Sequence, residues 1–250
     1  MPQFSDDIYL GPAFAGSSAV SAGPSPMELG VGPMGRVYVF DAVPLTLQAS
    51  GLAGSQAVGG AGNLTLTAGT GVTASTDAFG PVRYVLDMPR SVSAVSSNAG
   101  DTTQTATVYG YDVYGQAMSQ VITLNGTTTV KTTKMFKSVY RIAMSASTAG
   151  NVSAGYGDDI GLPVRVTDLG YIASMMFNGA AVTIDSTNFG VADTTSPATT
   201  STTDVRGYVK AAGLSGGANG TKRLVMTIAL PELAVGPNAT RVGAYGVTQV

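Results

Sequence analysis

Tyr156-Gly157-Asp158-Asp159 is one of two short patterns in this chain whose residue types could do chemistry. Paired aspartates in this motif bind two metal ions in polymerases, where the metals stabilise both oxygens of an in-line phosphoryl transfer. The chain has 250 residues, which is short for a polymerase, and no Asp-x-x-x-x-Asp motif lies upstream. We therefore interpret the motif as a loop between strands that precedes Ile160. A structural cation held by Asp158 and Asp159 is the alternative.

The second pattern is the run GVGPMG at residues 30–35, which matches the G-x-G-x-x-G fingerprint of dinucleotide-binding proteins. That fingerprint needs a strand before it and a helix after it, because the helix N-terminus holds the pyrophosphate. Here a proline-rich segment precedes the run and the strand-like sequence RVYVF follows it. We interpret the match as a consequence of the high glycine content and expect no bound cofactor.

The residue types that most often catalyse reactions are missing, since the chain contains no histidine, no cysteine and no tryptophan. A serine nucleophile would have no histidine as its base, and no G-x-S-x-G elbow is present to expose one. General acid–base chemistry would depend on carboxylates and lysines alone. We therefore expect a protein that is not an enzyme and that has no catalytic residue, cofactor or catalytic metal.

Charged residues make up 11% of the chain, against roughly 25% in an ordinary soluble domain. The formal net charge of −2 favours neither nucleic acid nor an anionic membrane as a partner. No apolar run is long enough to cross a bilayer. A surface with so little charge indicates that other subunits cover much of it.

One segment is basic, with four cations within eleven residues. These cations are Lys131, Lys134, Lys137 and Arg141. Residues alternate between the two faces of a strand, which places Phe136 and Tyr140 opposite Lys137 and Arg141. The aromatic rings then cannot interleave with the charges to form a stacking platform for bases. Two interpretations remain open, a solvated face of a hairpin and a surface that docks on an acidic protein.

Residues 1–35 contain three Gly-Pro pairs and show no helical or alternating pattern, which predicts an extended Pro/Gly-rich N-terminal arm. A free tail gains nothing from large apolar side chains, whereas an arm that docks on a neighbouring subunit buries them. The arm residues expected at such an interface are Phe4, Ile8, Tyr9, Leu10 and Phe14.

Beyond residue 35, short β-branched and aromatic runs alternate with turn residues, which predicts an all-β fold with a β-sandwich or jelly-roll-like core. Strands are expected at residues 36–40, 45–49, 64–68, 82–87, 104–112, 118–124, 127–131, 135–145, 160–166, 182–185, 205–210 and 223–230. Asn125-Gly126 predicts a two-residue hairpin turn. The best candidate for a short helix is the segment 170–177, which is apolar almost all round.

We divide the chain into the arm at 1–35, a main β-sandwich domain at 36–170, and residues 171–250. The last segment is either a second small β region or the completion of the same sheets. The sequence decides neither this point nor the oligomeric state.

Two runs resemble proteins of tailed bacteriophages that are described as virion structural, capsid decoration or cement proteins. The first run, residues 105–145, contains a strand ending in G-Y-D-V-Y-G, the hairpin I-T-L-N-G-T and the basic strand F-K-S-V-Y-R-I. The second, residues 151–166, ends in G-L-P-V-R-V, and residues 204–226 echo the pattern more weakly. The resemblance implies a β-sandwich core with extended arms that binds the outside of an icosahedral shell, often as a dimer or trimer.

From this resemblance we expect a cement protein on the virion capsid surface, synthesised in the host cytoplasm. Its partners would be the major capsid protein and other copies of itself. The arm would extend along neighbouring subunits, and the basic segment would meet an acidic capsid surface.

Two other functions stay open. The chain could be a receptor- or glycan-binding module of a fibre or tail, in which exposed tyrosines stack on sugar rings. The tyrosines proposed for that role are Tyr109, Tyr111, Tyr114 and Tyr156. Alternatively, the chain could be a head–tail connector or tail-tube subunit, which would assemble into a ring.

Overall fold

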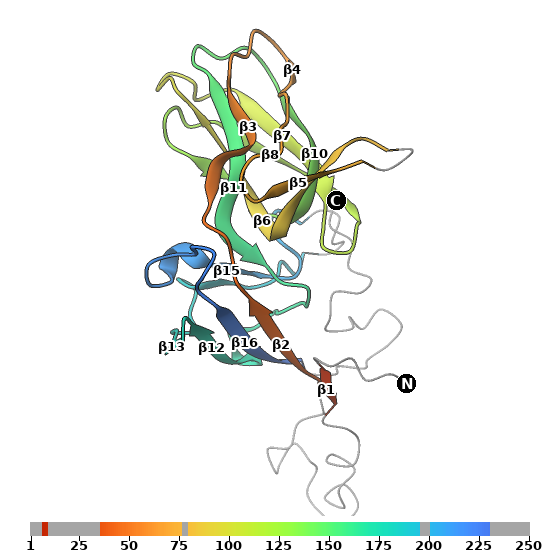
Figure 1. Ribbon diagram of the computed structural model, residues 1–250, viewed down its shortest axis with the longest axis vertical. Coiled ribbons are helices and arrows are strands. Elements are labelled where there is room, and N and C mark those ends of the chain that lie inside the picture. Colours follow the sequence, from red (N-terminus) through yellow and green to blue (C-terminus); the bar gives the residue numbers. More distant parts are fainter. Residues whose placement is uncertain (1–6, 10–35, 77–79, 196–200, 231–250) are drawn as a thin grey trace, which may run out of the picture.

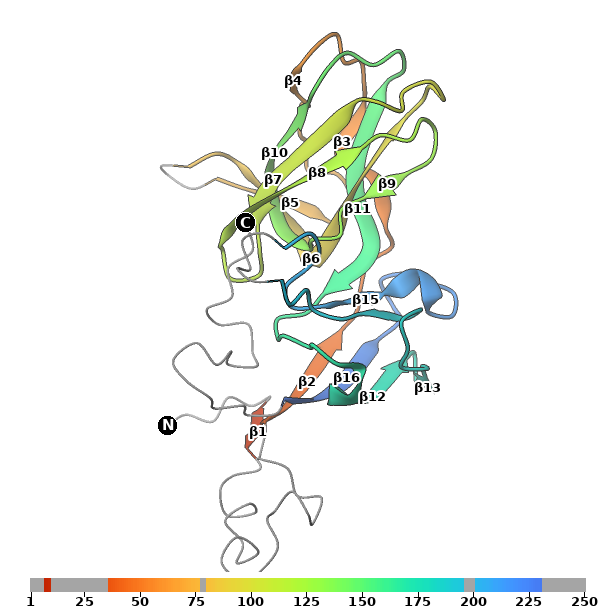
Figure 2. The same ribbon diagram turned by 180° about the vertical axis from the view of Figure 1, so that it is seen from behind.

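The computed structural model describes residues 7–9, 36–76, 80–195 and 201–230, and these residues form two lobes stacked along the long axis of the molecule (Figure 1). The upper lobe consists of residues 45–157. The lower lobe consists of residues 36–44 together with the described residues from 158 to 230. The view from behind shows the same two lobes, with β11 running from the upper into the lower one (Figure 2).

The larger sheet has eleven strands, all paired antiparallel. Its main order is β14 (Phe189–Gly190), β15 (Tyr208–Lys210), β11 (Val152–Gly161), β6 (Arg83–Ser96), β10 (Phe136–Met144), β7 (Thr105–Tyr111) and β8 (Ala117–Thr123). Four further strands pair beside this path: β3 (Gln48–Gln56) on β11, β4 (Gly62–Asn63) on β10, and both β5 (Val72–Ser75) and β9 (Val130–Lys131) on β6. The sheet curls around the upper core and continues into the lower lobe through β11.

The smaller sheet lies in the lower lobe and joins distant parts of the chain. Its order is β1 (Asp7–Tyr9), β2 (Arg36–Ala42), β16 (Leu224–Leu230), β12 (Ile172–Phe177) and β13 (Ala180–Ala181). Two short 3₁₀ helices, η1 (Leu169–Tyr171) and η3 (Ala211–Gly213), complete this lobe. Residues after 170 therefore contribute strands to both sheets.

Each lobe has its own hydrophobic core. The upper core is built from the inward residues of the curled sheet, such as Leu52, Phe136 and Ile142. The lower core combines Phe40 of β2 with residues between Ile160 and Ile228. The predicted all-β class with a sandwich-like or jelly-roll-like core is confirmed, because two layers of strands enclose apolar side chains and the described residues contain no α-helix.

Several local predictions differ from the structure, and the segments 64–68 and 182–185, which were expected to be strands, are irregular. The segment 170–177 is not a helix but η1 followed by β12, in which Ile172, Met175 and Phe177 are buried against the lower core. The loop predicted at Asp158 and Asp159 is instead part of β11. The two-residue turn expected at Asn125-Gly126 is present but shifted by one residue, because Asn125 pairs with Thr128 across Gly126 and Thr127. Gly126 has a φ of 58°.

Candidate functional site

The arm contributes an edge strand to the smaller sheet. Ile8 pairs with Val37 and Tyr9 pairs with Arg36, so β1 continues the sheet beyond β2. The other arm residues expected at an interface, Phe4, Leu10 and Phe14, lie outside the described residues, as does the run at 30–35. The arm thus supplies at least one backbone segment that can extend a sheet edge.

Lys131 of the basic segment pairs with the two carboxylates that were the alternative cation site. Its Nζ lies 3.0 Å from Asp158 Oδ1 and 2.9 Å from Asp159 Oδ2. Burial lowers the pKa of Lys131, but the hydrogen bonds and charges of Asp159 and Asp158 outweigh burial and raise it overall. Burial raises the pKa of Asp159, against the opposing effect of Lys131. The lysine ammonium therefore occupies the position that a cation would take.

The next two lysines also point into the molecule. Lys134 is buried and donates to the Ser119 carbonyl at 3.3 Å, and Lys137 donates to the Leu86 and Asp87 carbonyls at 2.7 and 3.0 Å. Burial lowers the pKa of both Lys134 and Lys137. The basic segment therefore does not present its ammonium groups together on one exposed face.

Arg141 lies instead among aromatic rings, which the alternation argument had excluded. Its guanidinium carbon is 3.8 Å from the centroid of the Tyr109 ring. The register between β10 and β7 shifts between Val139 and Arg141, so Tyr140 is an extra, bulged residue. Strict alternation fails at this bulge, and Tyr140 packs with its ring centroid 5.5 Å from Tyr111. The prediction that the rings and the charges lie on opposite faces is therefore wrong for Tyr140, which lies on the same side as Arg141.

The four tyrosines considered for sugar binding are not equivalent. Tyr156 is fully buried, and its hydroxyl donates to the Thr70 carbonyl at 3.2 Å. Tyr114 is partly exposed at a turn and donates to Pro163 of the lower lobe. Tyr109 and Tyr111 are half-buried on the outer face of β7, next to Tyr140. The structure thus gathers two of the four on one surface and places the other two elsewhere.

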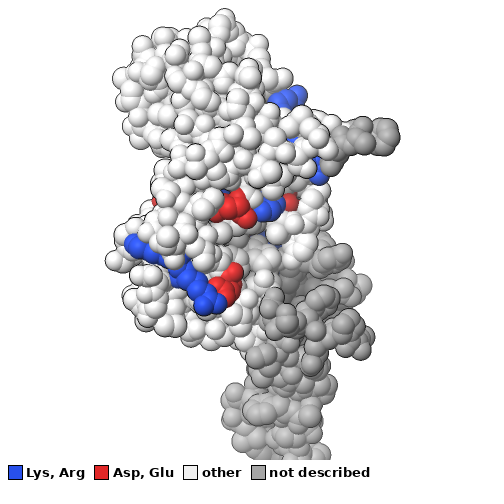
Figure 3. All heavy atoms as spheres, in the orientation of Figure 1, with Lys and Arg blue, Asp and Glu red and all other residues white. Residues whose placement is uncertain are grey.

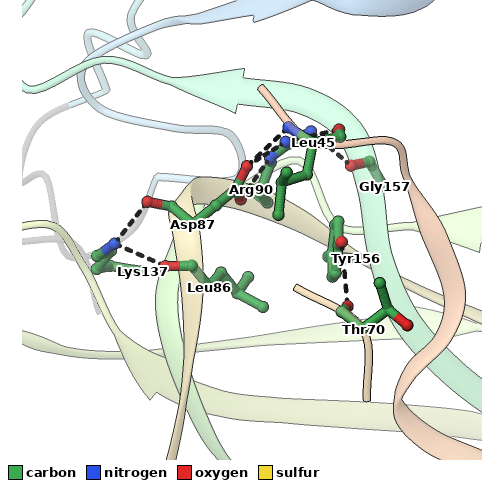
Figure 4. A network of polar contacts seen from close by, with 8 residues as sticks. All are labelled: Leu45, Thr70, Leu86, Asp87, Arg90, Lys137, Tyr156 and Gly157. Carbon is green, nitrogen blue, oxygen red and sulfur yellow. Dashed lines mark hydrogen bonds and ion pairs between the residues drawn. The ribbon is translucent and has the colours of Figure 1, made fainter. Parts of the chain in front are cut away.

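A buried polar network at the junction of the lobes was not predicted from the sequence (Figure 4). Arg90, which is fully buried, donates to both carboxylate oxygens of Asp87 at 3.0 and 2.6 Å and to the Leu45 carbonyl at 2.9 Å. The Leu45 amide in turn donates to Asp87. This network attaches the connection between β2 and β3 to β6. The signal in the sequence is an aspartate and an arginine three residues apart within one strand.

A second buried ion pair, between Arg206 and Asp112, joins the lower lobe to the upper one. Arg206 Nη2 lies 2.7 Å from Asp112 Oδ2, and both side chains are almost fully buried. Nearby, Asp204 accepts hydrogen bonds from the backbone amides of Met135 and Arg206 at 2.9 and 2.8 Å. Burial raises the pKa of Asp204 to about 6, although those hydrogen bonds oppose the shift. In both networks the charged groups bind partners within the chain and are not available to an outside ligand.

The surface left exposed is correspondingly poor in charge, as the almost uncharged upper lobe in Figure 3 illustrates. One exposed area is mainly apolar. It is the outer face of the smaller sheet, which turns away from the lower core. We define it by Val37, Val39, Ser174, Met176, Val225, Thr227 and Ala229, which pair across β2, β16 and β12.

Val39 and Met176 on this outer face are 36% and 42% exposed. In the described part of the face, charge is confined to one rim, where Arg223 Nε donates to Asp41 at 2.7 Å. The arm strand β1 extends the same sheet at its β2 edge. This combination of an open apolar face and an adjoining arm is the candidate functional site.

Other classes of site find no support in the described residues. No group of three or more histidine, cysteine, aspartate or glutamate side chains within them is placed to hold a metal ion. In the same residues, no helix has the length and apolar character needed to span a bilayer. Comparison of the chain with family models, with curated proteins and with solved structures finds no match in any of the three.

Proposed function

We propose that this chain is a non-enzymatic structural protein of a tailed-phage virion, which binds the outer capsid surface and cements neighbouring capsomers. The observation that carries the proposal is the apolar outer face of the smaller sheet, adjoined by a strand of the N-terminal arm. The resemblance of residues 105–166 to capsid decoration proteins supports the same role.

The physics of a capsid favours such a surface. A shell under internal DNA pressure opens at the seams between subunits, so a protein that buries apolar area across a seam opposes opening. Burial contributes roughly 25 cal/mol per Å² of apolar surface, and stable interfaces bury about 800 Å² on each partner. The lysines of the basic segment bind carboxylates and carbonyl groups of the chain itself. The proposal therefore rests on the outer face and the arm, and not on these lysines.

The test is the copy number of this chain relative to the major shell protein in purified particles, measured by quantitative mass spectrometry. A cement protein occupies the whole lattice, so we expect a ratio near one or a simple fraction such as one third. A trace ratio would place the chain at a tail or fibre and contradict cementing. Absence from the particles would contradict a virion role altogether.

A further inference from the structure

A cavity opens in the upper lobe where β10 changes partners. Val139 of β10 pairs with Tyr84 of β6, whereas Ala143 of β10 pairs with Asn63 of β4. Between these contacts lies a cavity of about 540 Å³, lined by Asn63, Leu64, Leu66, Tyr84, Tyr140 and Arg141 among others. Its volume falls within the range of roughly 300–1,000 Å³ that is typical of small-molecule sites.

The bulge in β10 brings Tyr140 and Arg141 to this cavity together. In a regular strand two consecutive residues would point to opposite faces, but a bulge re-aims one of them. Gly110 on β7 accommodates the bulge, because a Cβ there would lie 2.1 Å from the Ser138 carbonyl oxygen. The local backbone therefore places an aromatic ring and a cation side by side.

Arg141 is oriented without being neutralised. Its guanidinium rests on Tyr109, and Tyr109 lies 6.3 Å from Tyr140 between ring centroids. Within the described part of the chain, Arg141 forms no hydrogen bond or ion pair, and its buried Nε has no acceptor. The other arginines at buried positions discussed above, Arg90 and Arg206, each bind a carboxylate of the chain itself. A stacked guanidinium that lacks an anion is ready to bind one from outside.

The residues that line the cavity favour one class of anion over others. Arg141 is the one charged residue among the described residues that line the cavity, which suits a single carboxylate better than a polyphosphate. The Asn63 amide and the Tyr140 hydroxyl can exchange hydrogen bonds with hydroxyl groups, and Leu64 and Leu66 offer an apolar wall. A sugar ring carries hydroxyl groups at its rim and apolar C–H groups on its face. An extended peptide would need a free strand edge, and the Ile142 carbonyl is already bonded to Leu64.

We infer that this cavity binds an acidic sugar, such as a uronic acid residue of a glycan, and that Arg141 donates two hydrogen bonds to its carboxylate. The inference does not rest on the proposed role as a cement protein. A capsid-surface protein with such a site would attach the particle to acidic polysaccharide in addition to holding the shell.

The experiment is an NMR titration of the full chain with D-glucuronate, with D-glucose as the neutral match. We expect glucuronate to bind with a Kd on the order of 1 mM, as suits a ligand of this size, and glucose to bind at least about tenfold more weakly. Arg141→Gln should weaken glucuronate binding by at least about tenfold. Arg223→Gln removes the same charge from the lower lobe and should leave the Kd unchanged.

Tyr140→Phe keeps the ring and the fold while removing one hydroxyl, so it should weaken glucuronate binding less than Arg141→Gln does. Circular dichroism of each variant shows whether the fold is retained. Equal affinity for glucose, unchanged affinity in Arg141→Gln, or no binding of glucuronate would each overturn the inference. Equal affinity for N-acetylglutamate or for inorganic phosphate would also overturn it, because the site would then recognise an anion and not a sugar.

Discussion

At the scale of single residues, several of the few charged residues of this chain are buried. Arg90 and Arg206 are almost fully buried, and each binds a carboxylate, because an unpaired charge in an apolar interior is very costly. Lys131 forms ion pairs with both Asp158 and Asp159. The charged fraction of the sequence therefore overstates the charge of the surface, which strengthens the argument that partners cover part of it.

Asp204 makes the stability of the protein depend on pH. Its pKa is raised by burial to about 6 from an ordinary 3.8. Between these two values the folded state binds a proton that the unfolded state has lost, so the free energy of unfolding falls as the pH rises. The asparagine of Asp204→Asn cannot ionise. Between about pH 4 and pH 7 we therefore expect the free energy of unfolding to fall by about 2–3 kcal/mol less in this variant than in the unmodified protein.

The measurement is urea denaturation of both proteins across that pH range. Asp41→Asn is the matched control, since Asp41 is exposed and its ion pair with Arg223 lowers its pKa, the opposite of the shift at Asp204. The control should keep the slope of the unmodified protein. A slope of the same size in Asp204→Asn would contradict the assignment to Asp204.

The candidate residues show what the sequence could and could not reveal. Alternation along β10 correctly indicated a buried side for Ile142 and Met144. It failed for Tyr140, which is the extra residue of the bulge and lies on the outer side with Arg141, and no local pattern in the sequence indicates that bulge. Lys134 and Lys137 appeared as surface charges, since their acceptors are backbone carbonyls of β8 and β6 that are distant in sequence.

At the scale of elements, the bulge depends on a close approach of β7 and β10 at Gly110. A Cβ at that position would lie 2.1 Å from the Ser138 carbonyl oxygen and 2.7 Å from the Phe136 ring. Backbone cannot yield as a flexible side chain does, so we expect Gly110→Ala to destabilise the protein by at least about 1–3 kcal/mol. Thermal or urea denaturation measures this loss.

Gly54→Ala in β3 is the control, because a Cβ at Gly54 would meet no atom within 4 Å. It should leave stability unchanged or slightly increased, since alanine restricts the unfolded chain. If Gly110→Ala were as stable as Gly54→Ala, the bulge would not require the glycine.

The arm is the element on which the cement proposal depends. Deleting residues 1–20 removes β1, which pairs with β2 through three residues and is an edge strand. We expect the truncated chain to keep its fold, as judged by circular dichroism, and to lose its occupancy on the particle. Occupancy is measured by adding the truncated chain or the full chain to particles that lack the protein. Equal occupancy would show that the arm plays no part in binding.

Strands were predicted correctly where only one face of the strand is buried. They were missed where both faces of the strand are buried. β16 agrees with the predicted segment 223–230, since its apolar residues alternate inward and outward. Most of β11 and the second half of β6 were missed, because serine and glycine lie at buried positions there and alternation disappears. Gly155, for example, lies against the backbone of Gln48, where a larger side chain would not fit.

At the scale of the whole molecule, the lobes are joined by β11 and by the buried ion pair between Arg206 and Asp112. We expect the protein to unfold in one transition. Arg206→Ala leaves Asp112 buried without its partner, which costs about 3–5 kcal/mol and weakens the coupling of the lobes. Denaturation followed by tyrosine fluorescence and by circular dichroism should then give two midpoints that no longer coincide.

Arg223→Ala is the control for this effect, because it breaks an exposed ion pair within the lower lobe. Its midpoint should stay close to that of the unmodified protein and the two probes should still coincide. Coincident midpoints in Arg206→Ala as well would mean that Arg206 does not couple the lobes.

The pairing of β2 with β16 has a consequence for the order in which the protein is made. Asp41 and Arg223 are neighbours although 182 residues separate them, and the whole upper lobe lies between. A ribosome releases the upper lobe as one continuous stretch, which can fold during translation. The smaller sheet cannot form until β16 has left the ribosome. The outer face therefore forms only after the upper lobe has been synthesised, because it needs β16 beside β2.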